Sequence, residues 1–427
     1  MSIVIFGLLG MLIIGTPIAA AFALTVFINA DRLNIWIDGL STIPYDNISS
    51  FALVAIPLFI LVGELMNRGG LAQSLAATAD QIIGRIRASF GYVMILASAF
   101  FGAITGSSVA TVAAIGSTIG PEMRQRGYPR SYIASLNAAS GLLGVLIPPS
   151  IPLIIYGSTV GVSITELFIA TIVPGILLTL CFAIVHWFRS KRVLEGGGES
   201  PISTVLSNGV RERTKNTLLR SSAALIMPII VLGGIYGGIF TPTEAAAVAC
   251  LYAICVLFIQ RSLNFDGLVK TFYAAAVPAA AILFIIAMTG ILNRALILNQ
   301  IPQDLAALMT GLFENPILFL LAINLLLLLV GMFMETNAAV ILMGPLLAPS
   351  AAAFGIDPVH FAIVVVTNIE IGLLTPPLAA NLYVAARTNN VHLVEMLRHF
   401  GWFLLAAVVA LLLLTFIPSL SLWYRFF

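Results

Sequence analysis

Two groups of hydroxyl and amide side chains lie inside strongly apolar stretches of the sequence, where such groups are costly. Glycine residues accompany both groups, so that backbone carbonyls can approach them closely. Neutral oxygens together with carbonyls suit a sodium ion, whereas a proton relay needs buried carboxylates or histidines. The pattern indicates a cation site within the membrane. The first group is Thr105, Ser107, Ser108, Thr111 and Asn137, and the second is Thr336, Asn337, Asn368 and Thr375.

A simpler interpretation is that Ser, Thr and Gly only allow helices to pack closely. Against it, the stretches 102–161 and 331–390 follow one plan, and paired interruptions at matching places are typical of a transporter site. The matches are Asn137-x-x-x-Gly141-Leu142-Leu143 with Asn368-x-x-x-Gly372-Leu373-Leu374, and Pro148-Pro149 with Pro376-Pro377.

We expect the helices to be interrupted within residues 107–121 and 336–349. Lipid cannot satisfy the freed amides and carbonyls, so these must face protein or a wet cavity. Carbonyls at the C-terminus of a half-helix suit a cation, and amides at an N-terminus suit an anion.

A few charged residues share these stretches. Glu335 and Glu370 fall inside the second stretch, and either can face the cavity. Arg387 either meets an anionic substrate or extends to the lipid headgroups. Glu64 lies near the end of an apolar run, which favours the membrane interface.

The composition defines the class of protein. Hydrophobic residues make up 60% of the 427 residues and charged residues 9%, against about 25% charged in an ordinary soluble domain. Such a chain crosses a lipid bilayer many times, and its apolar runs, such as residues 317–330, have helical length. We therefore predict an all-α polytopic membrane protein. The net charge of +2 gives no sign of a nucleic-acid partner, and we expect none.

The chain reads as two similar halves. Thr16-Pro17 is echoed by Thr241-Pro242, and Asn67-Arg68 by Asn293-Arg294. We predict a first inverted repeat at residues 1–190, a linker at 191–220 and a second inverted repeat at 221–427. Residues 67–89 form either a helix in the membrane interface or a polar loop.

Charge predicts the orientation. The hydrophilic stretch 189–220 contains seven Lys and Arg residues, which favours the cytoplasmic side. Inverted halves then place both termini on the periplasmic side, and the first 30 residues contain no Lys or Arg.

The sequence offers no catalytic constellation. It contains no nucleotide-binding, zinc-protease or nucleophile-elbow motif, and its four histidines are scattered. We expect no enzyme activity and no catalytic or organic-cofactor site. The three cysteines fit helix packing.

Three motifs resemble the large membrane subunit of TRAP transporters, the tripartite ATP-independent periplasmic carriers: GSSVATVAAIGSTIGPEM, GLLGVLIPPSIPLIIYG and GLLTPPLAANLYVAA. The resemblance implies an elevator-type ion-transporter fold with two re-entrant hairpins and interfacial arm helices. It implies sodium-coupled uptake of an organic acid anion, of the sialic acid or C4-dicarboxylate type, across the bacterial inner membrane. A periplasmic solute-binding protein would deliver the substrate, and a separate small four-helix membrane subunit (Q type) would be a partner.

The resemblance also implies site residues. The sodium ligands would be Ser107, Ser108, Asn137, Gly141, Gly144 and Pro148 in the first half, and Gly331, Thr336, Asn337, Asn368, Gly372 and Thr375 in the second. Substrate would lie between the hairpin tips. The candidate substrate residues are Thr111 and Asn381, with Glu335 and Arg387 added from the preceding argument.

Two other functions remain open from the residues. One is an anion symporter of the citrate or arsenite type that needs no binding protein. The other is a passive scaffold or channel subunit, whose polar groups only hold helices together.

Overall fold

The computed structural model describes residues 7–8, 10–12, 14–31, 33, 35, 37–83, 88–195 and 226–426. These residues form α-helices and short 3₁₀ segments and contain no strand. Seven helices are long and apolar enough to cross a membrane, or eight if one bent pair is a single span. The predicted all-α polytopic fold is confirmed.

The first part of the chain runs from α2 to α12. Its two-residue turn at 106–107 joins α6 to α7, and a further interruption at 147–150 separates α9 from α10. The helices are α2 (Ile18–Ile28), α3 (Ile43–Ile48), α4 (Ala55–Arg68), α5 (Leu71–Ile83), α6 (Ser89–Thr105), α7 (Ser108–Gln125), α8 (Arg130–Ser140), α9 (Leu143–Leu146), α10 (Ile151–Val160), α11 (Ile164–Ala170) and α12 (Ile172–Glu195).

The later part begins with a helix at Ile226–Tyr236. A two-residue turn at 334–335 joins α17 to α18, and an interruption at 373–379 separates α19 from α20. The helices are α14 (Pro242–Ile259), α15 (Phe265–Leu298), α16 (Ile301–Leu312), α17 (Pro316–Phe333), α18 (Thr336–Ala353), α19 (Pro358–Gly372), α20 (Ala380–Asn389) and α21 (Leu393–Phe416).

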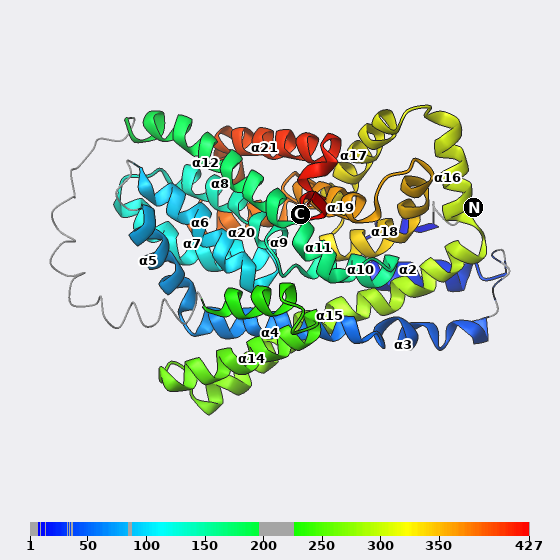
Figure 1. The fold of residues 1–427 in the computed structure, drawn as a ribbon, viewed down its shortest axis with the longest axis horizontal. Helices are drawn as coiled ribbons and strands as arrows, with labels where there is room; N and C mark the ends of the chain where they lie inside the picture. The colour runs from blue at the N-terminus through cyan, green and yellow to red at the C-terminus, as the bar shows by residue number, and fades with distance from the viewer. Residues whose placement is uncertain are drawn as a thin grey trace.

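The helices form two groups, and Figure 1 shows α3, α4, α14 and α15 along one side of the molecule. In this outer row α15 packs on α2, α3 and α4, and α14 packs on α4. The inner group comprises α6 to α10 and α17 to α21, where α20 packs on α7 and α8, and α10 packs on α18. The outer row meets the inner group where α4 contacts α6 and α15 contacts α18.

The interruptions lie elsewhere than the sequence predicted. Helix α7 runs without a break from Ser108 past Pro121, and α18 runs from Thr336 past Pro349, although Pro121, Pro345 and Pro349 lie inside them. Membrane helices tolerate such prolines because neighbouring groups satisfy the freed backbone. The chain is instead interrupted just before α7 and α18, and again at Pro148-Pro149 and Pro376-Pro377, which are both cis.

Helix α5 confirms that a helix follows residue 67, and it packs on α6 and α7. Residues 84–87 and 196–225 lie outside the described residues, so most of the predicted linker does too. Its first residues, 191–195, continue helix α12.

Two pairs of glycines allow the interrupted helices to cross at close range. A Cβ atom on Gly102 would lie 2.6 Å from the Cα atom of Gly144, and one on Gly372 would lie 2.7 Å from the Cα atom of Gly331. Gly144 and Gly372 each precede their Pro-Pro pair by four residues. Gly144 is therefore the counterpart of Gly372 in this contact, whereas the sequence motif pairs Gly141 with Gly372.

We predict that G102A or G331A destabilises the protein, because the added methyl groups meet backbone atoms that have no room to move. Overpacking of this kind costs about 1–3 kcal/mol, which thermal unfolding of the purified full chain would detect. The control is G401A in α21, where a Cβ atom meets nothing within 4 Å. Equal melting temperatures for all three variants would contradict the close crossing.

Candidate functional site

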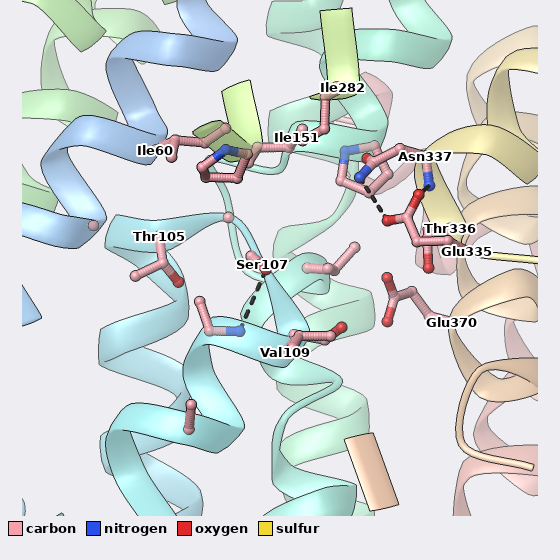
Figure 2. A pocket seen from close by; sticks show the side chains of 18 of the residues that line it. Ile60, Thr105, Ser107, Val109, Ile151, Ile282, Glu335, Thr336, Asn337 and Glu370 are labelled. Carbon is pink, nitrogen blue, oxygen red and sulfur yellow. Dashed lines mark hydrogen bonds between the residues drawn. The ribbon is translucent and has the colours of Figure 1, made fainter. Parts of the chain in front are cut away.

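A cavity of about 350 Å³ lies where the two turns approach each other. We call residues 106–107 the first tip and residues 334–335 the second tip. Residues of α4, α6, α7, α9, α10, α15, α18, α19 and α20 line the cavity. Figure 2 shows Ser107 from the first tip on one side, and Glu335 from the second tip with Thr336 and Asn337 from α18 on the other.

The first tip is fixed by backbone geometry and one hydroxyl. Gly106 adopts a left-handed conformation with φ of 61°, which glycine tolerates best. The amide of Ile151 donates to the Gly106 carbonyl at 3.3 Å and so ties the tip to the break before α10. The Ser107 hydroxyl accepts from the Ala110 amide at 3.4 Å and caps α7.

The second tip is fixed in the same way but with a carboxylate. Glu335 accepts from the amides of Asn337 at 3.0 Å and Ala338 at 3.3 Å, and so caps α18. The side-chain amide of Asn337 donates to the other Glu335 oxygen at 2.7 Å. The Leu378 amide donates to the Met332 carbonyl at 3.0 Å, which ties this tip to the break after α19.

The structure brings most of the first predicted sodium group together. A Cβ atom on Gly144 would lie 2.7 Å from the Ser107 carbonyl oxygen, and one on Gly141 would lie 3.2 Å from the Ser108 carbonyl oxygen. Ser107 and Ser108 also line the cavity. Pro148 lies in the adjacent break.

The two predicted asparagine ligands each retain an unused oxygen. Asn137 is buried and donates to the Val112 carbonyl at 2.9 Å, which fastens α8 to α7. Asn368 is buried and donates to the Asn324 side-chain oxygen at 2.8 Å. Neither side-chain oxygen has a hydrogen-bond partner among the residues the structure describes. Both are therefore free to act as ligands, although neither residue lines the cavity.

In the second group, Thr336 and Asn337 line the cavity. Gly331 and Gly372 form the helix crossing, which brings α17 against α19. Thr375 lies in the second break, where its hydroxyl donates to the Ile371 carbonyl at 3.4 Å, and it does not line the cavity.

Of the four predicted substrate residues, Glu335 lines the cavity and the other three do not. Thr111 is buried behind the first tip and donates to the Ser107 carbonyl at 2.8 Å. Asn381 is buried, and Arg387 is exposed near the end of α20. The substrate roles of these residues stay predictions.

Two further acidic residues line the cavity. Glu370 lines it from α19, as the sequence allowed, whereas Glu64 lines it from α4, where the sequence favoured the membrane interface. No Lys, Arg or His is among the described residues that line it. The sequence signal for Glu370 was its position between Asn368 and Gly372, within one helical turn of both.

Known proteins resemble this chain in sequence and in fold. The family model of the DctM component of tripartite ATP-independent periplasmic transporters matches residues 2–420. The chain belongs to this family. It is a TRAP large membrane subunit, which makes it part of a transporter permease and not an enzyme.

Several curated relatives agree over nearly the whole chain. The C4-dicarboxylate TRAP large permease DctM of Rhodobacter capsulatus is 35% identical over 99% of this chain and 98% of its own length. The sialic acid TRAP large permease SiaM of Vibrio cholerae is 33% identical over 98% of this chain and 96% of its own length. The isethionate TRAP permease DctMQ of Oleidesulfovibrio alaskensis is 38% identical over 99% of this chain, which spans 66% of that longer protein.

Two solved structures share the fold. The YdaH transporter of Alcanivorax borkumensis aligns with a TM-score of 0.63 at 14% identity, covering 92% of this chain and 90% of that one. MtrF of Neisseria gonorrhoeae aligns with a TM-score of 0.55 at 12% identity, covering 89% and 85%. This TRAP subunit therefore has the helical architecture of membrane transporters.

We predict that E335A loosens the second tip, because the two α18 amides lose their acceptor. Loss of such a cap costs about 0.5–2 kcal/mol, so thermal unfolding should show a lower melting temperature. E335Q keeps one side-chain oxygen and should retain most of the stability. The control is E314A on the exposed α16–α17 connection. An E335A variant as stable as E314A would mean that the carboxylate does not hold the tip.

Proposed function

We propose that this TRAP subunit carries out sodium-coupled, secondary active uptake of an organic acid anion. The observation that carries the proposal is the meeting of two capped tips at one cavity, next to buried oxygens without hydrogen-bond partners. Oxygens that are kept dry and unpaired are costly unless a ligand uses them. Two sets of neutral oxygens, one around Ser107 and Asn137 and one around Thr336 and Asn368, would hold the sodium ions.

The relatives favour a small organic anion as the substrate. Those named above are permeases for C4-dicarboxylates, sialic acid and isethionate, which are carboxylates and a sulfonate. We propose that the substrate of this chain belongs to the same broad class. It would occupy the cavity between the tips, where the amide groups at the start of α7, which has no carboxylate cap, suit a negative charge.

We further propose an elevator mechanism in which the inner helix group moves as one body against the outer row. The backbone hydrogen bonds that join each tip to its neighbouring break support this idea, because they would make the tips move together with α10 and α19. The two halves would be inverted repeats, with the linker in the cytoplasm and both termini in the periplasm. The permease would lie in the bacterial inner membrane, with a small Q-type membrane subunit and a periplasmic solute-binding protein as partners.

The coupling is tested in proteoliposomes that contain the complex with its partners. We expect accumulation of a labelled C4-dicarboxylate, sialic acid or isethionate only when sodium is higher outside than inside. A potassium gradient of equal size is the control. Accumulation of any of these solutes that ignores the sodium gradient would reject sodium coupling.

The two proposed sodium sites are tested by substitutions that fill the space around their ligands. S108L and T336L place a bulky side chain at two buried positions that line the cavity. We expect uptake to fall by about 10²-fold, the size of loss that follows when a site needing exact geometry is misplaced by about 1 Å. The amount of protein in the membrane should stay similar. The control is T310L on the exposed face of α16. Full uptake by S108L and T336L would exclude a role for these two positions in cation binding.

A further inference from the structure

The two glutamates near the second tip are used in different ways. Both oxygens of Glu335 accept hydrogen bonds, from the α18 amides and from Asn337. Glu370 is 1% exposed, and its Oε2 atom has no hydrogen-bond partner among the described residues. Figure 2 shows the Glu370 carboxylate on the cavity side, next to Glu335 and Thr336. Glu335 is thus explained by its capping role, whereas Glu370 is not.

Among the residues that the structure describes, none supplies a positive charge to the cavity beside Glu370. The described residues that line the cavity include three glutamates and no Lys, Arg or His. A buried carboxylate without a cationic partner is strongly unfavourable. A positive charge from outside the chain would remove this penalty.

The same place provides additional oxygen ligands. The hydroxyls of Thr336 and Ser108 lie beside the Glu370 carboxylate, one from each helix that follows a tip. Thr336 is 2% exposed, and its hydroxyl lacks a hydrogen-bond partner in the described part of the chain. One carboxylate with neutral hydroxyl oxygens matches a small alkali cation, since hard cations prefer oxygen ligands.

We propose that Glu370, with Thr336 and Ser108, binds a sodium ion that bridges the two tips. This inference rests on the sodium coupling proposed above and adds a charged ligand to its neutral ones. The ion would also supply the countercharge that the cavity lacks, so an anionic substrate would be accepted only after the cation. A cavity of this kind holds an organic anion without any arginine.

The test is equilibrium binding of radioactive sodium to the purified full chain in lipid nanodiscs, without substrate. We expect E370Q to bind one sodium ion fewer per chain than the wild type. E370D keeps the charge and should restore that ion with weaker affinity. The matched control is E395Q, an exposed glutamate on α21, which should bind as the wild type does.

The outcomes separate this inference from the proposed function. If E370Q binds as many sodium ions as a sodium-binding wild type, the site at Glu370 is wrong while sodium coupling stands. If the wild type binds no sodium, the coupling itself fails. If the sodium count is unchanged but E370Q alone loses the pH dependence of solute binding or its binding of an ammonium-bearing solute, the occupant is a proton or the substrate, and the inference is overturned. Loss of sodium binding in E370D to the same extent as in E370Q would also count against a charged ligand.

Discussion

The structure depends on how the backbone is satisfied where it stops being helical inside an apolar protein. Each tip leaves amides and carbonyls without partners in its own helix, and lipid offers none. Two backbone hydrogen bonds meet part of this need by tying a tip to the break beside it, from Ile151 to Gly106 and from Leu378 to Met332. Each tip and its break are thereby coupled in position. Ser107 and Glu335 satisfy further amides by capping α7 and α18 beside the cavity.

Close approach of the helices is the second requirement, and glycine provides it. At Gly102 and Gly144, and again at Gly331 and Gly372, no side chain fits between the crossing backbones. Lipid is as apolar as the helix side chains, so burial of apolar surface does not drive helices together in a membrane. Close packing at small residues stabilises the helix contacts instead. They also explain why the tips stay beside the Pro-Pro breaks, because each crossing lies one turn from a tip on one helix and four residues from the prolines on the other.

The sequence predicted the class and the neighbourhood of the site but not its geometry. Long apolar runs require helices in lipid, and Pro148-Pro149 and Pro376-Pro377 mark real interruptions. The interruptions were predicted inside residues 107–121 and 336–349, but α7 and α18 continue through Pro121, Pro345 and Pro349, because packed membrane helices tolerate single prolines. Glu64 was assigned to the interface because a run of apolar residues ends near it, and only tertiary packing reveals that α4 borders the cavity.

The two tips have the same backbone plan and different chemistry. Ser107 and Glu335 hold the same position, each capping the helix that follows its tip, one with a neutral hydroxyl and the other with a carboxylate. Only the second tip therefore carries a charge, and its neighbour Glu370 adds another on the same side of the cavity. Glu64 of α4 lines the cavity on the first side, where α4 packs on α6, so the first side has one acidic residue and the second has two. This difference would draw a bound cation toward the second side and leave the amides at the start of α7 to face the negative end of a solute. The asymmetry would thus orient the substrate, although the backbone frame around it is nearly symmetric.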